Sequence, residues 1–284
     1  MSDAPMPMHE EPLQRRTGEL GKRVISAIVM GTAAIGAAWL GGIVFLAVWL
    51  MAAVLVWWEW TGVIKAVPRP LLIGVGTVAL VCMGVALALD AAAIAFVCAV
   101  IGGGVAMAAV QERRVWAGAG VFYAALILIP AVMLRDDAGF GLTAIFWLFA
   151  VVWAQDTGAY FAGRFFGGPK LAPAISPNKT WSGAAGGMAA GIAAGIAILY
   201  LSGAAVRPMH VVVSIAVIAS AMLGDLLESW IKRHFGAKDS GALIPGHGGA
   251  MDRLDGFVVA ATVALVIGLV RGGTDQPAMG LLQW

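Results

Sequence analysis

Long apolar runs recur along the chain from residue 24 onward and constrain the fold more than any other feature of the sequence. A helix that spans a bilayer needs about 20 mostly apolar residues. The chain is 61% hydrophobic and only 12% charged, whereas soluble domains carry about 25% charged residues. A water-soluble globule cannot bury so much apolar surface, because it always exposes a large part of its surface. The sequence therefore predicts that lipid is the solvent.

The apolar runs predict nine membrane-spanning helices, and hence an all-α, polytopic integral membrane protein. The predicted spans are 24–40, 42–58, 70–89, 91–110, 115–134, 142–162, 183–203, 208–228 and 256–271. Residues 1–23 form a polar tail that is predicted to be cytoplasmic. The five spans within 24–140 contain no charged residue and are interpreted as a membrane scaffold. Residues 141–284 are interpreted as a catalytic membrane region with two cytoplasmic loops, 163–182 and 229–255.

The Lys and Arg residues are unevenly divided between the two ends of these spans. If successive spans cross the membrane in opposite directions, 15 of the 18 Lys and Arg residues fall on the side of the N-terminal tail. The other side receives only Arg135, Arg207 and Arg271. Cytoplasmic loops of membrane proteins are enriched in Lys and Arg. The N-terminus and both long loops are therefore predicted to lie in the cytoplasm.

Three carboxylates lie near the ends of otherwise apolar spans: Asp156, Asp225 and Glu228. An ionised carboxylate near the bilayer centre costs about 2.5–3.5 kcal/mol on insertion scales, so their presence needs a reason. One explanation is that they lie in the last turns of their helices and reach interfacial water. The other is that they line a polar cavity, open to the cytoplasm, and bind a cation.

Helical spacing places several acidic residues on shared faces. Asp225, Glu228 and Ser229 stand at i, i+3 and i+4, so their side chains share one face of the helix. Asp252 and Asp255 are three residues apart at the start of the last span, where the helix dipole favours carboxylates. Two such carboxylate pairs across a crevice would make an oxygen-rich site suited to Mg²⁺.

The two long loops combine these carboxylates with cations and glycines. The polar residues considered are Lys232, Arg233, Lys238 and Arg253 in one loop, and Arg164, Lys170, Ser176, Lys179 and Thr180 in the other. Glycines such as Gly248 and Gly249 let backbone N–H groups approach an anion closely. Acidic groups for a metal and basic groups for phosphate are typical of a phosphoryl- or nucleotidyl-transfer site. A single Lys or Arg in these loops fits a topology signal equally well.

The stretch SWIKRHFGAKDSGALIPGHGGAMDRLD contains a specific pattern of residues. Its pattern positions are Ser229, Ile231, Lys232, Arg233, Lys238, Asp239, Gly241, Ile244, Pro245, His247, Gly248, Gly249, Asp252, Arg253 and Asp255. This pattern resembles the signature of the phosphatidate cytidylyltransferases, or CDP-diacylglycerol synthases. QDTGAYFAGRFFG and KLAPAISPNKTWSG resemble upstream segments of the same family, so the specific resemblance covers about 155–257. Asn178 and Ser182 depart from it, because a basic residue and a Glu are expected there.

This resemblance implies a reaction in which CTP and phosphatidate give CDP-diacylglycerol and pyrophosphate with Mg²⁺, a second metal ion being left open. The phosphate of phosphatidate is already an anionic nucleophile, so the main obstacle is repulsion between two anions. Metal ions and surrounding Lys and Arg residues would reduce that repulsion. The implied partners are CTP, phosphatidate and membrane lipid, without nucleic acid and with a homodimer left open. The implied location is the inner membrane, with the active site facing the cytoplasm.

The resemblance also implies roles for individual residues. The expected metal ligands are Asp225 and Asp252, with Asp156 and Asp255 as companions. The expected catalytic groups are Asp225, Asp252, Asp255, Asp239, Lys232, Arg233, Lys238, His247 and Arg253. The expected substrate-binding residues are Arg164, Lys170, Ser176, Lys179, Thr180, Ser229, Gly248 and Gly249.

Two other functions remain as alternatives. A CTP-dependent lipid kinase of the polyprenol or phytol type would transfer the γ-phosphate of CTP instead of its cytidylyl group. A cation transporter could use Asp156 and Asp225, but it would need polar groups that continue to the outer side, and the last four spans offer few. The aspartate motif of CDP-alcohol phosphotransferases is absent from the sequence.

Overall fold

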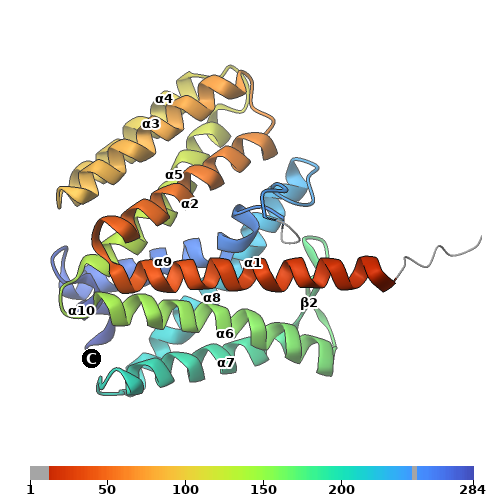
Figure 1. Cartoon of the computed structure of the whole chain (residues 1–284), viewed down its shortest axis with the longest axis vertical. Coiled ribbons are helices and arrows are strands. Elements are labelled where there is room, and N and C mark those ends of the chain that lie inside the picture. Colours follow the sequence, from red (N-terminus) through yellow and green to blue (C-terminus); the bar gives the residue numbers. More distant parts are fainter. Residues whose placement is uncertain (1–12, 245–247) are drawn as a thin grey trace, which may run out of the picture.

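The computed structural model describes residues 13–244 and 248–284, with side chains from residue 24 onward. The described residues form nine long helices, a two-stranded hairpin and a short C-terminal helix (Figure 1). The helices are α1 (Leu13–Leu40), α2 (Gly42–Val63), α3 (Arg69–Ala88), α4 (Ala92–Ala108), α5 (Arg114–Asp136), α6 (Gly141–Phe166), α7 (Trp181–Leu201), α8 (Pro208–His234), α9 (Met251–Gly272) and α10 (Pro277–Leu282). Helices suit a lipid solvent because each one satisfies its own backbone hydrogen bonds.

Every predicted span overlaps one of the long helices. Seven of the described helices, α2, α3 and α5 to α9, are long and apolar enough to cross a membrane, while α4 and the apolar part of α1, Val24–Leu40, are shorter. This result confirms an all-α, polytopic membrane protein. The number nine and the cytoplasmic N-terminus stay predictions. Several helices extend beyond the predicted bounds, and α2 continues to Val63.

A short antiparallel hairpin follows α6 in the region that the sequence suggested was a loop. Its strands are β1 (Lys170–Ala172) and β2 (Ser176–Thr180), with Lys170 opposite Thr180. β2 runs directly into α7, because the Thr180 hydroxyl accepts a hydrogen bond from the Gly183 N–H at 3.1 Å and caps that helix. This cap therefore fixes the start of α7 directly after the hairpin.

Helices α6 and α7 pack closely because small residues line their contact. A Cβ added at Gly187 would lie 2.7 Å from the carbonyl oxygen of Gln155, and one added at Gly186 would lie 2.2 Å from the Ala162 Cβ. Small residues allow backbones to approach in lipid, where no hydrophobic force drives helices together. This close packing holds the end of α6 against the hairpin.

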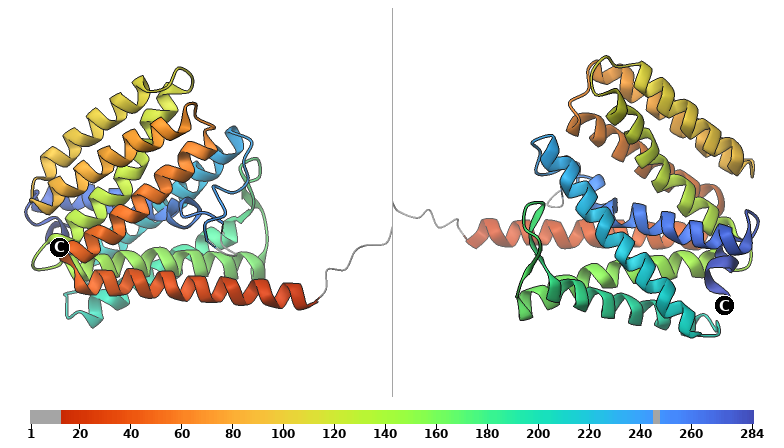
Figure 2. Two further views of the ribbon diagram at one scale, coloured as in Figure 1. Left: turned by 45° about the horizontal axis from the view of Figure 1, so that its top comes forward. Right: turned by 180° about the vertical axis from the view of Figure 1, so that it is seen from behind.

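The two polar connections lie at the same end of the helices. The hairpin and the connection between α8 and α9 occupy one end, whereas α10 and the C-terminus lie at the other (Figure 1). The view from behind in Figure 2 shows the same arrangement. Helix α5 runs through the middle of the structure, and most of its residues are buried. The fold thus brings together the two loops that the charge distribution placed on one side.

Candidate active site

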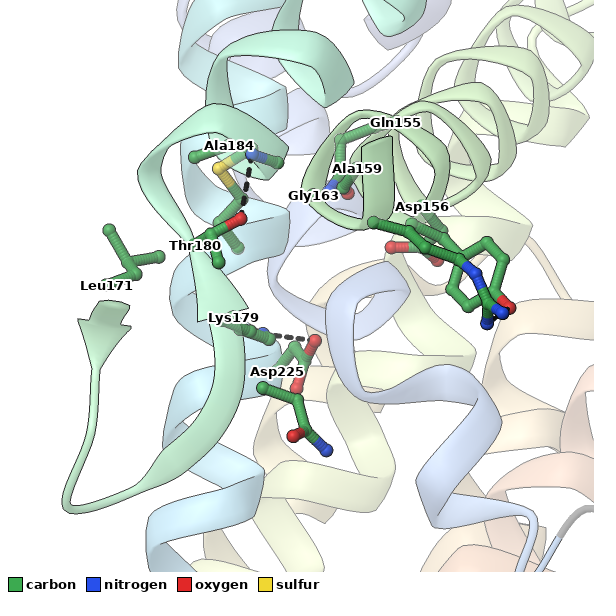
Figure 3. Close-up of a pocket in the computed structure, with 14 residues that line it drawn as sticks. Gln155, Asp156, Ala159, Gly163, Leu171, Lys179, Thr180, Ala184 and Asp225 are labelled. Carbon is green, nitrogen blue, oxygen red and sulfur yellow. Dashed lines mark hydrogen bonds and ion pairs between the residues drawn. The ribbon is translucent and has the colours of Figure 1, made fainter. Parts of the chain in front are cut away.

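A polar cavity of about 560 Å³ lies between the end of α6, the start of α7, the hairpin and α8. Its lining includes Asp156 and Arg164 from α6, Lys179 and Thr180 from β2, and Asp225 from α8 (Figure 3). All five were candidate site residues in the sequence. These residues are distant in the sequence, and the packing of α6, α7 and α8 brings them together. The cavity therefore joins the two loops into one candidate site.

The Lys179 ammonium forms an ion pair with the Asp225 carboxylate across this cavity (Figure 3). Both side chains are partly exposed, at 26% and 31%. The Ser229 hydroxyl donates to Asp225 Oδ1 at 3.5 Å, which confirms that these two residues share a helix face. The pair places a cation from the hairpin and a carboxylate from α8 at one point of the cavity.

Three carboxylates from three helices approach one another beside this ion pair. Asp156 of α6 and Asp225 of α8 line the same cavity, and Asp255 of α9 lies within electrostatic range of both. The positive charges of Lys179 and Arg253 are within electrostatic range of Asp156. An acidic group of this kind favours a bound cation, because a positive charge between the carboxylates would reduce their repulsion.

The three carboxylates are suitable Mg²⁺ ligands by their chemistry, but the structure does not place them close enough together to bind one ion. Carboxylate oxygens are the ligands that Mg²⁺ prefers in proteins. Within residues 13–244 and 248–284, however, no three acidic, His or Cys side chains stand as close together as a bound metal ion requires. The Lys179 ammonium is at Asp225, and the Gly256 N–H donates to Asp255 Oδ1 at 2.7 Å. Metal binding would therefore need the Lys179 side chain to move away from Asp225.

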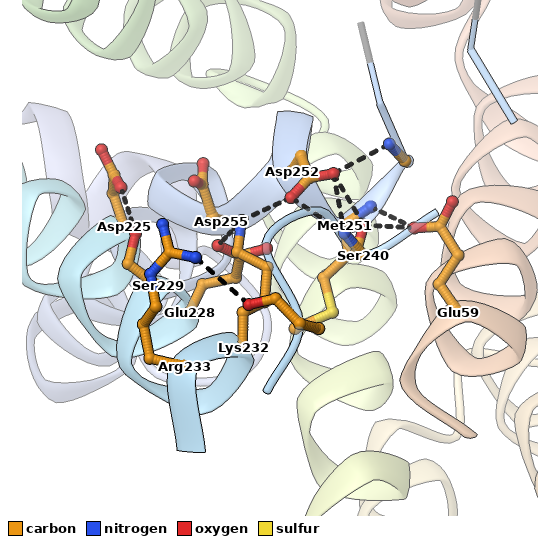
Figure 4. Close-up of polar contacts among 12 residues, drawn as sticks. Glu59, Asp225, Glu228, Ser229, Lys232, Arg233, Ser240, Met251, Asp252 and Asp255 are labelled. Carbon is orange, nitrogen blue, oxygen red and sulfur yellow. Dashed lines mark hydrogen bonds and ion pairs between the residues drawn. The ribbon is translucent and has the colours of Figure 1, made fainter. Parts of the chain in front are cut away.

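Asp252 lies in a second polar cluster, between α8, α9 and their connection (Figure 4). Its Oδ1 accepts from Lys232 Nζ at 2.5 Å, and its Oδ2 accepts from the Ser240 hydroxyl at 2.9 Å and the Gly249 N–H at 2.8 Å. Lys232 Nζ also pairs with Glu228 Oε2 at 2.6 Å. Asp252 thus holds the connection in place through protein donors. Its expected role as a metal ligand stays a prediction.

The remaining expected site residues lie on the exposed side of the same end of the molecule. The exposed residues are Lys170, Arg233, Lys238, Asp239 and Arg253, while Ser176 is partly buried. Gly248 has a φ of +80°, a left-handed conformation that favours glycine. His247 lies outside the described residues. Ser182, where the resemblance expected Glu, donates to the Gly167 carbonyl and lies 3.1 Å from the Thr180 hydroxyl.

Two helices of the predicted scaffold also contribute polar groups to this end. Glu59 of α2 is 1% exposed, and it lies one residue beyond the predicted span 42–58 because α2 continues to Val63. Tyr123 of α5 has a buried hydroxyl with no hydrogen-bond partner among the described residues. The single Glu in the stretch WWEW could have identified Glu59 as a candidate, whereas nothing in the sequence distinguished Tyr123.

The comparison with known proteins agrees with this geometry. The model of the cytidylyltransferase family matches residues 21–270, and the chain belongs to this family. Among its relatives, the phosphatidate cytidylyltransferase of Brucella suis is 41% identical over 261 residues, which cover 91% of this chain and 97% of the relative. The phosphatidate cytidylyltransferase of Haemophilus influenzae is 39% identical over 144 residues, covering 49% and 50%. The family match includes the N-terminal half, which the sequence motifs left as generic spans.

Proposed function

We propose that the chain transfers the cytidylyl group of CTP to phosphatidate, giving CDP-diacylglycerol and pyrophosphate. The family membership and the names of the relatives that match nearly the whole chain support this function. The observation that carries it is the joining of the hairpin and α8 at one polar cavity, where Lys179 meets Asp225. Cations and carboxylates together are what a reaction between two phosphate-bearing substrates needs.

In the proposed reaction, a phosphate oxygen of phosphatidate attacks the α-phosphorus of CTP. The bond from that phosphorus to the oxygen bridging the α- and β-phosphates breaks, and pyrophosphate leaves with that oxygen. The attacking phosphate is already an anion, so no strong general base is required. The protein has to orient the two substrates and reduce their repulsion.

The exposed cations at this end are suited to that task. Lys179 lies inside the cavity, and Arg164 and Lys170 flank it on α6 and β1. Lys238 and Arg253 belong to the neighbouring connection and to α9. We assign the cations of α6 and the hairpin to one phosphate-bearing substrate. The cations of the connection and of α9 are assigned to the other substrate, because the two sets come from different elements.

Mg²⁺ is the proposed cofactor, and it would supply further charge neutralisation at the phosphates when bound. The proposed ligands are Asp156, Asp225 and Asp255, while Asp252, which the family resemblance implied as a main ligand, stays a predicted one. The position of Asp156 and Asp225 in one cavity lining, with Asp255 within electrostatic range of both, supports this assignment. A second metal ion stays a prediction, as does a homodimer.

The proposed setting is the cytoplasmic face of the inner membrane. The end of α6 and the start of α7 carry exposed aromatic side chains: Tyr160, Phe161, Phe165, Phe166 and Trp181. Aromatic residues are enriched where a membrane meets water. A cavity beside such a belt suits a lipid that enters sideways and a nucleotide that arrives from solution. The distribution of Lys and Arg supports the cytoplasmic side.

Product analysis with α-labelled CTP tests this function directly. Purified protein is incubated with phosphatidate, Mg²⁺ and CTP that carries ³²P at the α-phosphate. A cytidylyltransferase moves the label into the lipid fraction and releases unlabelled pyrophosphate. A lipid kinase leaves the label in soluble CDP, and that result, or an absence of labelled lipid, would refute the proposal.

A further inference from the structure

Glu59 of α2 reaches from the N-terminal helices into the connection that precedes α9. Its Oε1 accepts from the Ala250 N–H at 2.9 Å, and its Oε2 accepts from the Met251 N–H at 2.8 Å (Figure 4). The Ser240 hydroxyl lies 3.1 Å from the same Oε2. These partners lie more than 180 positions further along the chain, as the sequence separations of 181, 191 and 192 show. A buried carboxylate that accepts several hydrogen bonds makes a strong contact, because hydrogen bonds to a charged group are stronger than those between neutral groups.

The contacts of Glu59 continue as far as α8. The Ser240 hydroxyl also lies 2.9 Å from Asp252 Oδ2, so a single hydroxyl group lies between two carboxylates. Asp252 accepts from Lys232, and Lys232 pairs with Glu228. A continuous series of polar contacts thus connects α2, the connection, α9 and α8. Such a network specifies one arrangement when its members are satisfied.

Glu59 also serves the start of α9. The residue before this helix, Ala250, has no side chain that can cap it. The first N–H groups of a helix need acceptors, and the positive end of the helix dipole favours a carboxylate there. Glu59 supplies this carboxylate from another helix. The first turn of α9, which contains Asp252, is therefore attached to α2.

Two glycines of the signature stretch pack against the Glu59 carboxylate. A Cβ added at Gly249 would lie 2.5 Å from both carboxylate oxygens of Glu59, and one added at Gly241 would lie 2.9 Å from Oε1. Neither glycine has a positive φ. Space beside Glu59 is therefore a reason for glycine at these two positions, in addition to the approach of phosphate that the sequence suggested.

We propose that Glu59 is a positioning residue for the transfer reaction. It fixes the connection between α8 and α9, and thereby the orientation of Asp252 and Lys232, without touching either substrate. This inference rests on the proposed function. Because Glu59 acts through other residues, its loss should lower kcat more than it raises KM for CTP or phosphatidate. A purely structural role would lower the yield of folded protein and leave the kcat of the folded fraction unchanged.

The first experiment compares Glu59→Gln and Glu59→Asp with Glu112→Gln, an exposed glutamate before α5 that serves as the matched control. Activity is normalised to the folded protein recovered by size-exclusion chromatography. Glu59→Gln should lower kcat by about 10²-fold, because a small misplacement of reacting groups can cost that much. Glu59→Asp keeps the charge and should restore part of the rate, and Glu112→Gln should match the unmodified protein. A normal kcat in folded Glu59→Gln would overturn the proposal.

A second experiment tests the contact itself and does not depend on Glu59→Gln folding. Gly241→Ala should reduce kcat in the unmodified protein, because the new methyl group displaces the Glu59 carboxylate. The same change should have little further effect in Glu59→Ala, so the two effects should not be additive. Additive effects would contradict the proposed contact.

Amide hydrogen exchange separates this inference from the proposed function. Peptides that cover residues 248–255 should exchange faster in Glu59→Gln than in the unmodified protein and in Glu112→Gln, because an amide replaces one of the two oxygens that accept from the Ala250 and Met251 N–H groups. Unchanged exchange would refute the positioning role even if activity fell. If the unmodified protein made no CDP-diacylglycerol, the proposed function would fail, while this exchange experiment would still decide whether Glu59 positions α9.

Discussion

The contacts around α2 and α5 and the contact between α6 and α7 are built by different kinds of packing. Around α2 and α5, large aromatic side chains such as Trp57 and Trp60 are fully buried, and a Cβ added at Gly120 would lie 2.3 Å from Trp60. Between α6 and α7, glycine and alanine bring the backbones together. Each of the two regions, α2 to α5 and α6 to α9, has a cavity. The one between α3 and α4 is lined by apolar residues and two cysteines, whereas the one at the end of α6 and α7 contains charged side chains.

The two regions also contribute different carboxylates to the polar end of the molecule. Helices α6, α8 and α9 supply the carboxylates that face one another near the cavity. Helix α2 supplies one buried carboxylate, Glu59, which binds backbone and hydroxyl donors of the connection before α9. The comparison teaches that the N-terminal helices are more than a membrane scaffold. They also support the residues that the C-terminal helices present.

The largest expected effect comes from the C-terminal region, at Asp225. Asp225→Asn should lower kcat by at least about 10³-fold, because it removes a charged ligand from a proposed metal site whose stabilisation is worth several kcal/mol. The initial rate of CDP-diacylglycerol formation measures this effect. Asp275→Asn, at an exposed position near the other end, is the control and should leave the rate unchanged. A variant at Asp225 that kept a tenth of the rate would contradict its assignment.

Asp252 tests whether the connection before α9 works as one unit with Glu59. Asp252→Asn should lower kcat by about 10²-fold, because the amide weakens the contact with Lys232 and the N–H of Gly249. The measurement is the initial rate at saturating CTP and phosphatidate, with folded protein monitored separately. Combined with Glu59→Gln, the loss should be smaller than the product of the single losses. Independent losses would indicate that the two carboxylates act separately.

Gly187 and Gly104 test whether the close approach of α6 and α7 contributes to stability. Gly187→Ala should destabilise the protein by about 1–3 kcal/mol through overpacking, since its Cβ would lie 2.7 Å from the Gln155 carbonyl oxygen. Gly104→Ala in α4 meets nothing within 4 Å and should be neutral or slightly stabilising. The midpoint of thermal unfolding in detergent measures both. Equal midpoints for the two variants would show that α6 and α7 tolerate wider spacing.

The smallest expected effect is at Lys238, which is exposed on the connection. Lys238→Ala should raise KM for CTP by about tenfold, the loss of one charge-assisted contact, while KM for phosphatidate changes little. Steady-state kinetics with each substrate varied in turn provides the measurement. An unchanged dependence on CTP would remove Lys238 from the nucleotide site.

Much of the candidate site could be predicted from local patterns in the sequence. The i, i+3, i+4 spacing placed Asp225 and Ser229 on one helix face, and the structure has them in contact. The unequal distribution of Lys and Arg placed the two loops at one end, where the structure has the cavity. These predictions succeed because helical periodicity and membrane topology act over short stretches of chain. The metal roles of Asp156, Asp225, Asp252 and Asp255 are all still predictions.

The sequence by itself determined the solvent, the helical class and the family resemblance, because hydropathy and motif spacing are local properties of the chain. Only the tertiary structure decided which distant residues meet. Nothing near Glu59 in the sequence indicates that it would accept hydrogen bonds from Ala250 and Met251. The hairpin that brings Lys179 to Asp225 depends in the same way on the packing of α6 against α7 and of α7 against α8. Contacts of this kind are set by the packing of whole helices, which no short stretch of sequence specifies.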